Sequence, residues 1–194
     1  MKEKKENLYF ITGNNHKFNE ISLALQLNNI KYQLKQLNIN LIEIQSDNPK
    51  EIALFKLQSI KNDIKGSYFI EDAGFFIDYP LNGFPGVYSS YIFRTIGNEG
   101  VLKLIDNFEI TKAHFSSIIA LYYKPLEKEF LFKGIVEGSV SPRIRGTNGF
   151  GYDPIFIPND YPDKTFAEIN IKEKNKISHR GLAIKKLVEF LKKN

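Results

Sequence analysis

Two neighbouring acidic residues, Glu71 and Asp72, directly follow a short apolar run and precede Gly74. Carboxylates at the end of a strand can ligate a hard cation such as Mg²⁺, and one of them can orient or deprotonate a water molecule. Because side chains alternate along a strand, we expect the two to face different ways and only one to be the central group. The pair is also typical of an ordinary turn.

The segment Thr12-Gly-Asn-Asn-His-Lys17 lies between an expected strand and an expected helix. Gly13 permits a tight turn, the following backbone N–H groups point toward the helix N-terminus, and Lys17 adds a cation. This arrangement suits a phosphate group. The second glycine and the Lys-Ser/Thr pair of a Walker A loop are absent, so an ordinary turn with an exposed lysine is the alternative.

A third segment, Gly146 to Pro154, contains three glycines interleaved with Phe150 and Tyr152. Such a loop can bring backbone close to a flat ligand and stack a ring on it. From Gly149 the pattern reads G-x-G-x-x-P, which is not a dinucleotide-binding fingerprint. A glycine-rich hairpin with buried aromatic rings is the alternative interpretation.

The fourth segment is Lys174-Asn-Lys-Ile-Ser-His-Arg180, in which Ser178 is the expected N-cap of the final helix. His179 and Arg180 then lie in the first helical turn, where cations oppose the helix dipole unless an anion or acceptor lies nearby. This local conflict favours a functional role. His16 and His114 have no such context, and we expect them to be a loop residue and a strand residue without special function.

The 194 residues carry a net charge of +5, with 42% hydrophobic and 25% charged residues and no cysteine. These values are typical of a globular chain, and they exclude disulfides and Cys-ligated metal sites. No apolar run approaches 18 residues and no signal peptide is recognisable, so we expect no membrane partner and a cytoplasmic location. Eight Lys/Arg against two Asp/Glu between Lys172 and Lys193 give a local charge of +6, which suits a nucleic acid, one polyphosphate ligand or a solvated helix face.

Helices and strands position these segments. In the first part of the chain strands and helices alternate, and in the later part we expect strands that pair with one another. We expect strands over 8–12 and 68–70, one or two strands over 32–44, and a hairpin of 114–123 with 129–140 around Pro125. Helices are expected from the 13–15 turn to about Leu27, from the Asn48 cap to Gly66, and after Ser178. The fold class is α/β, a mixed sheet flanked by helices in one domain over residues 1–194.

The chain resembles the Ham1/inosine triphosphate pyrophosphatase family, whose members hydrolyse non-standard purine nucleoside triphosphates. The segment GFPGVYSSY at 83–91 adds to the four segments above, and FPGVYSSYIFRTIGNEG is most similar to the archaeal branch. The matching segments, in the family's order and spacing, are TGNNHKFNE at 12–20, EDAGFFID at 71–78, GFPGVYSSY at 83–91, GTNGFGYDPIF at 146–156 and TFAEINIKEKNKISHRG at 165–181.

The resemblance implies an elongated, twisted mixed sheet in two lobes with the active site in a cleft between them. It also implies a cut between the α- and β-phosphates of ITP, dITP or XTP that gives the monophosphate and pyrophosphate, and a homodimer. Ala73 stands where many members carry Ser or Thr, so only a backbone contact carries over there. A Maf-type pyrophosphatase acting on pyrimidine or modified nucleotides is the nearer rival, and a basic nucleic-acid-binding module the more distant one.

The same resemblance implies the role of each site residue. The implied catalytic residues are Asp72, as general base, and Lys17. The implied ligands of Mg²⁺ are Glu43 and Asp72, supported by Glu71. The implied triphosphate contacts are Thr12, Gly13, Asn14, Asn15, His16, Lys17, Lys56, Ala73 and Lys174. The implied base pocket consists of Phe150, which would stack on the base, with Gly151, Tyr152, Asp153, His179 and Arg180.

Overall fold

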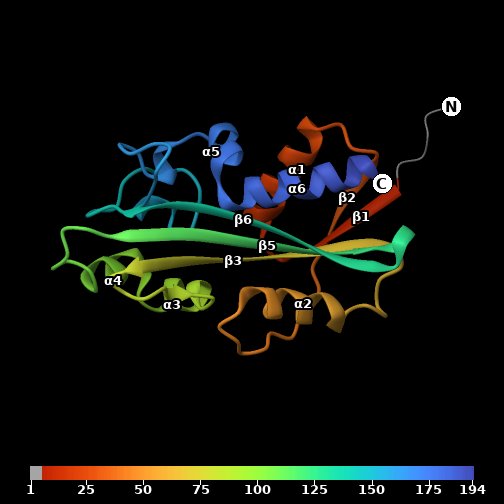
Figure 1. Ribbon diagram of the computed structural model, residues 1–194, viewed down its shortest axis with the longest axis horizontal. Helices are drawn as coiled ribbons and strands as arrows, with labels where there is room; N and C mark the ends of the chain where they lie inside the picture. The colour runs from red at the N-terminus through yellow and green to blue at the C-terminus, as the bar shows by residue number, and fades with distance from the viewer. Residues whose placement is uncertain (1–5) are drawn as a thin grey trace. The chain divides into compact units, whose positions relative to one another are not determined.

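The computed structural model describes residues 6–194 and contains six α-helices and a seven-stranded mixed sheet within that range (Figure 1). The strand order is β2-β1-β3-β5-β6-β7, and β4 pairs with β3. The strands are β1 (Glu6–Ile11), β2 (Tyr32–Leu37), β3 (Ser67–Tyr79), β4 (Phe84–Gly86), β5 (Lys112–Tyr123), β6 (Lys128–Val140) and β7 (Phe156–Pro158). The helices are α1 (Asn15–Leu27), α2 (Pro49–Ser59), α3 (Ser89–Thr95), α4 (Gly97–Lys103), α5 (Ile171–Ile177) and α6 (His179–Lys193).

The sheet is mixed, as predicted, because β1 pairs in parallel with β2 and β3 whereas β3 with β4 and β6 with β7 are antiparallel. The chain divides into two compact units, each of several segments. Unit 1 comprises residues 1–72, 117–133 and 183–194, and unit 2 comprises residues 73–116 and 134–182. No helix among residues 6–194 is long and apolar enough to cross a membrane.

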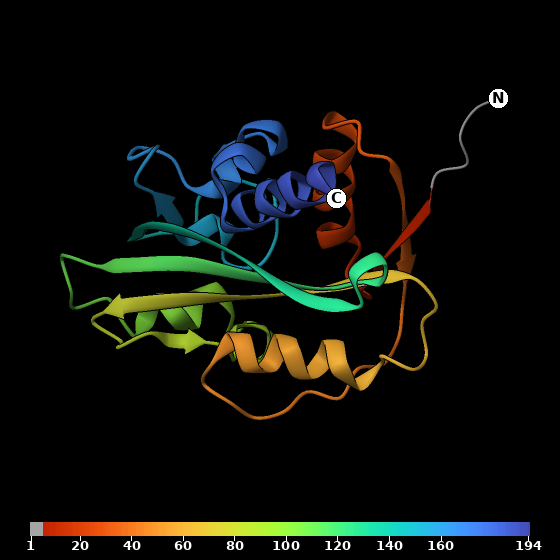
Figure 2. The same cartoon turned by 45° about the vertical axis from the view of Figure 1, so that its right-hand side comes forward.

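In unit 1, alternate residues of the central strands enter two separate cores. Phe10 and Phe69 stack with ring centroids 4.6 Å apart and pack with α1 and α6, whereas Tyr68 and Ile70 pack with α2. Both views of the ribbon place α1 and α6 on one face of these strands and α2 on the other (Figure 2). Each large side chain buried in this way stabilises the fold by about 1.5–3 kcal/mol. Because successive side chains of a strand point to opposite faces of the sheet, the position of a residue in the strand decides which helix it packs against.

The core of unit 2 is mostly aromatic. Phe75, Phe115, Phe156 and Phe166 are buried against one another, with ring centroids 4.8–6.0 Å apart in the contacting pairs. Within this unit α3 and α4 lie on one side of β3 and β5, and α5 lies on the other side (Figure 1). The glycine-rich segment precedes Phe156 in the chain and α5 follows Phe166, so both are attached to this aromatic core.

Three predicted element boundaries are wrong. β3 does not end before the acidic pair but continues to Tyr79, because Phe75 and Ile77 are fully buried and pair with β4. Of the one or two strands expected over 32–44, only β2 forms, and it ends at Leu37 because it pairs residue by residue with β1, which itself ends at Ile11. Helix α2 begins at its Asn48 cap as predicted but stops at Ser59, well before Gly66.

Candidate functional site

The segment after β1 forms the N-terminal end of α1, as predicted. The Asn14 side chain caps the helix by accepting a hydrogen bond from the backbone N–H of Lys17 at 3.1 Å, and the Thr12 hydroxyl accepts one from the N–H of Asn14 at 3.1 Å. The Asn15 amide oxygen accepts from Gln36 at 3.3 Å, and His16 is exposed. No acidic residue occupies the first turn of α1, so the helix end remains suited to an anion.

Lys17 reaches from α1 to Glu71 of β3. Its Nζ lies 2.8 Å from Glu71 Oε2 and 3.3 Å from the Glu71 backbone oxygen. The other carboxylate oxygen, Oε1, accepts a hydrogen bond of 2.6 Å from the hydroxyl of Ser117 on β5. The Glu71 side chain is fully buried, whereas 19% of the Lys17 side chain is exposed. Both oxygens of Glu71 are therefore turned toward protein donors.

Asp72 meets a different lysine. Lys56 Nζ of α2 lies 2.7 Å from Asp72 Oδ2 and 2.6 Å from Glu43 Oε1. Burial lowers the pKa of Lys56, but the negative charge of Asp72 and the hydrogen bonds to Asp72 and Glu43 together outweigh burial, so the pKa is raised above 10.5. Lys56 is therefore an ammonium ion at neutral pH. Glu43 lies in the irregular segment after β2, with 70% of its side chain exposed.

The Lys56 ammonium marks a point at which two carboxylates meet a cation. Glu43 and Asp72 supply hard oxygen donors, and both side chains are accessible, 70% and 24% exposed respectively. Mg²⁺ is commonly held by one or two carboxylates together with water and substrate phosphates, so this pair fits a divalent ion. Within residues 6–194 no group of three His, Cys, Asp or Glu side chains is placed to bind a metal. Glu43 and Asp72 are therefore placed where an ion could bind, whereas Glu71 contacts Lys17 and Ser117.

In unit 2, Asp153 organises the glycine-rich segment. Its Oδ2 accepts a hydrogen bond from the backbone N–H of Phe150 at 2.8 Å and lies 2.6 Å from Lys174 Nζ. Asp153 and Lys174 are both buried, 3% and 2% exposed. Gly149 has φ of +74°, and a Cβ there would collide with Asp153 Oδ2. Only glycine therefore fits at this position.

Lys174 and Arg180 lie over the same ring. Lys174 Nζ and Arg180 Cζ are each 5.4 Å from the centroid of Phe150, which is only half-buried. Cations over an aromatic face are attracted by its quadrupole. Lys174, which the sequence predicts to contact phosphate, is thus paired with Asp153 in the structure. Phe150, in turn, is a partly accessible ring with cations beside it.

His179 and Arg180 occupy the first turn of α6, as predicted, and both are 3% exposed. The Ser178 hydroxyl accepts a hydrogen bond from the N–H of Gly181 at 3.1 Å, which confirms Ser178 as the helix cap. The His179 ring stacks on Phe115, with centroids 4.6 Å apart and planes inclined by 10°. A Cβ at Gly181 would collide with the Asn175 carbonyl oxygen, so α5 and α6 meet closely here.

Tyr152 lies deeper than its neighbours. It is 4% exposed, its ring stacks on Phe75, and its hydroxyl donates to the backbone oxygen of Ser89 at 2.9 Å. Burial raises the pKa of Tyr152, so the phenol stays neutral. The structure therefore gives Tyr152 a place in the core beneath the segment. Gly151, with φ of +64°, is held by the Asn98 side chain, which donates to its backbone oxygen at 3.1 Å.

The predicted residues thus form two groups, one in each unit. Ala73 is the first residue of unit 2 and continues β3. Sequence reasoning did not identify Ser117, Ser89 or Asn98, which hold functional candidates in place. The only signal for Ser117 in the sequence is a hydroxyl residue, next to Ser116, immediately before the apolar run of that hairpin arm.

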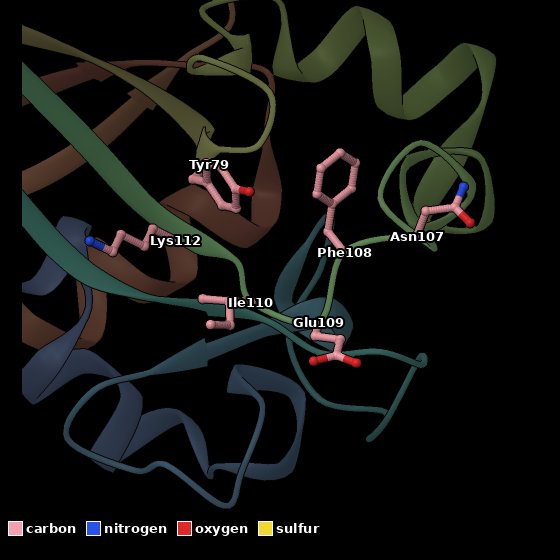
Figure 3. Close-up of a pocket in the computed structure, with 6 residues that line it drawn as sticks. All are labelled: Tyr79, Asn107, Phe108, Glu109, Ile110 and Lys112. Carbon is pink, nitrogen blue, oxygen red and sulfur yellow. The ribbon is translucent and has the colours of Figure 1, made fainter.

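A surface depression of about 550 Å³ lies elsewhere in unit 2 (Figure 3). Tyr79 and Phe108 meet edge to face across it, with centroids 5.9 Å apart. It contains none of the predicted site residues, and its only charged side chains are Glu109 and Lys112. We therefore assign no chemistry to it.

Comparison with known proteins gives one consistent result. The model of the Ham1 family matches residues 8–190. Proteins described as dITP/XTP pyrophosphatase from Pyrococcus horikoshii and Methanopyrus kandleri are 44% and 42% identical over 187 and 185 residues, covering 96% and 95% of this chain and 97% and 96% of theirs. The solved structure of the Staphylococcus aureus Ham1 protein superimposes with a TM-score of 0.82 at 28% identity, covering 97% of this chain and 99% of that one. The structure of a Ham1 protein from Coxiella burnetii gives the same TM-score at 27% identity, covering 97% of this chain and 100% of that one.

Proposed function

Because the chain belongs to the Ham1 family, we propose that it hydrolyses non-standard purine nucleoside triphosphates to the nucleoside monophosphate and pyrophosphate. The observation that carries the proposal is the pairing of Lys56 with Glu43 and Asp72, together with Lys17 of α1, which pairs with Glu71, the neighbour of Asp72 in β3. The names of the archaeal relatives support dITP and XTP as substrates, and we add ITP because it carries the same base as dITP.

Unit 1 supplies the residues for the triphosphate. A triphosphate carries about four negative charges near neutral pH, and transfer chemistry of this kind depends on positioning and charge neutralisation. Glu43, Glu71 and Asp72 outnumber Lys17 and Lys56 by one charge. These side chains alone would therefore repel the substrate, which supports a divalent ion, Mg²⁺, held by Glu43 and Asp72. When bound, that ion would neutralise phosphate charge.

Asp72 is our candidate for the general base. Its carboxylate is partly exposed, and Lys56 holds one of its oxygens at 2.7 Å, which fixes the orientation of the group. An oriented carboxylate of this kind can take the proton of a water molecule that attacks the α-phosphorus. Lys17 would hold the phosphate oxygens near the N-terminus of α1, where the Asn14-capped turn presents backbone N–H groups.

Unit 2 supplies the residues for the base. Phe150 offers a partly accessible ring, and Arg180 carries only hydrogen-bond donors. Hypoxanthine and xanthine present an acceptor at O6 and a donor at N1, whereas adenine presents the reverse. A site that donates to O6 leaves buried groups unpaired against adenine, and such mismatches cost on the order of 10⁴-fold.

We also propose a homodimer in the cytoplasm as the working form.

The test is an assay with separate detection of pyrophosphate and orthophosphate. The purified chain is incubated with dITP, XTP, ITP, dATP, dGTP and UTP, with Mg²⁺ or with EDTA. We expect pyrophosphate and the monophosphate from the first three substrates only, and no turnover with EDTA. Orthophosphate as the product would move the cut to a terminal bond, and faster turnover of UTP would favour a Maf-type enzyme. Salt-sensitive binding of nucleic acid without any turnover would favour the binding module.

A further inference from the structure

We infer that Ser117 and Glu71 form a buried device that positions Lys17, and that Glu71 is not a metal ligand. This inference rests on the proposed function, since Lys17 matters there as a phosphate contact. The observation behind it is a continuous chain of contacts within unit 1. It runs from the Ser117 hydroxyl to Glu71 Oε1 at 2.6 Å, and from Glu71 Oε2 to Lys17 Nζ at 2.8 Å.

The first step is the direction of the Glu71 side chain. Phe69, two residues earlier in β3, packs in the core beside α1, whereas Ile70 packs in the core beside α2. Because the faces alternate, Glu71 lies on the α1 face and Asp72 on the α2 face, where they meet Lys17 and Lys56. In this structure the two carboxylates therefore do not converge on one point where an ion could bind both.

The second step is the burial of the Glu71 side chain, which has no exposed surface. A buried carboxylate is tolerated only where donors compensate its charge. Ser117, itself fully buried, donates a hydrogen bond to one oxygen, and the Lys17 ammonium forms an ion pair with the other. A metal ion with a water and phosphate shell requires accessible ligands, and Glu43 and Asp72 have that property.

The third step is what this does to Lys17. A lysine has four rotatable bonds, so an unanchored ammonium is spread over many positions. Here it is tied to the Glu71 carboxylate and, at 3.3 Å, to the Glu71 backbone oxygen, while 19% of the side chain remains exposed. The anchor holds the ammonium beside the α1 N-terminus, and a misplacement of about 1 Å can cost 10²-fold in such sites. Ser117 is therefore a positioning residue that acts through Glu71.

The experiment is a double-mutant cycle on kcat/KM for dITP with Ser117→Ala, Lys17→Met and both together. Ser117→Ala should lower kcat/KM on the order of tenfold, mainly through KM, while adding it to Lys17→Met should change the value less than about twofold. Ser116→Ala is the matched control, because Ser116 is also buried in β5 and its Oγ has no hydrogen-bond partner in the described structure. It should leave kcat/KM unchanged. Ser117→Cys, which keeps a weak donor, should restore part of the loss.

A full tenfold loss in the Lys17→Met background, or no loss in Ser117→Ala, would overturn the inference. Crystal structures of the wild type and of Ser117→Ala without substrate provide a readout that does not depend on activity. We expect Lys17 Nζ to move by about 1 Å or more when the Ser117 hydroxyl is removed. An unmoved Lys17 contradicts the inference even if the wild type proves inactive, whereas an inactive wild type with a displaced Lys17 contradicts only the proposed function.

Discussion

Glu71 and Asp72 are neighbours in β3 and form ion pairs with two different lysines, on α1 and on α2, at 2.8 Å and 2.7 Å. The alternation of the strand sends the first into a buried pair and the second toward accessible space beside Glu43. Two residues of the same chemistry thus acquire different tasks from one geometric rule. We expect the buried one to position and the accessible one to react.

Replacing Asp72 tests the reactive role. Asp72→Asn keeps the size of the side chain but removes its ability to accept a proton, so we expect kcat for dITP to fall by about 10²–10⁴-fold with a smaller change in KM. Asp78→Asn is the control, because Asp78 lies in the same strand and pairs with His114 at 2.8 Å, outside the proposed machinery. Wild-type turnover by Asp72→Asn would remove Asp72 from the role of base.

Replacing Lys174 separates a phosphate contact from a structural one. Lys174→Met removes an ionic partner of the buried Asp153, and breaking such a pair costs about 3–5 kcal/mol. We therefore expect a large fall in the free energy of unfolding, measured by urea denaturation. A rise in KM with unchanged stability would instead show that Lys174 serves the substrate.

Gly149 and Gly151 form an internal comparison, because both have positive φ but different surroundings. Gly151→Ala has nothing within 4 Å of the new Cβ, so we expect only the backbone penalty of about 1–2 kcal/mol. Gly149→Ala also collides with Asp153 Oδ2 and should lower the melting temperature clearly more. Equal melting temperatures for the two variants would contradict the close approach described here.

Stability should fall in alkaline solution. Burial raises the pKa of Tyr68 from 10.0 to about 12, so the folded state favours the protonated phenol. The stabilisation by the protonated phenol is complete below pH 10 and is lost as the pH rises from 10 to 12. At pH 11 the loss amounts to about 1 kcal/mol. Urea denaturation at pH 8 and pH 11 measures it. Tyr68→Phe, which also loses the hydrogen bond to the Leu57 oxygen, should show a smaller difference between the two pH values.

The sequence predicted those features that local rules determine. The Asn48 cap, the Ser178 cap and the turn before α1 are set by side chains within four residues, and the structure confirms all three. The expected opposite directions of Glu71 and Asp72 follow from strand geometry and are also confirmed. By contrast, the end of β2 and the length of β3 depend on partners distant in the chain, and these predictions were wrong.

The site shows the same division. That Lys17 belongs with an anion could be read from its place near a helix start, but its partner Glu71 lies 54 residues away. The resemblance to the Ham1 family indicated Glu43 and Lys56, and the structure brings both to Asp72. Ser117 could not be found from sequence, because its role depends on which face of β5 it occupies.

The alternation of β3 also limits which changes of chain length the gene can tolerate. Deleting or inserting a single residue between Ser67 and Glu71 would move each side chain of the acidic pair to the opposite face of β3. The aspartate would then lie on the face that packs against α1, and the glutamate on the face that packs against α2. Such a one-residue insertion or deletion would exchange the positions of the two carboxylates even if the remaining strands still assembled. Length variation in descendants of this sequence should therefore avoid that short stretch and gather in the surface connections.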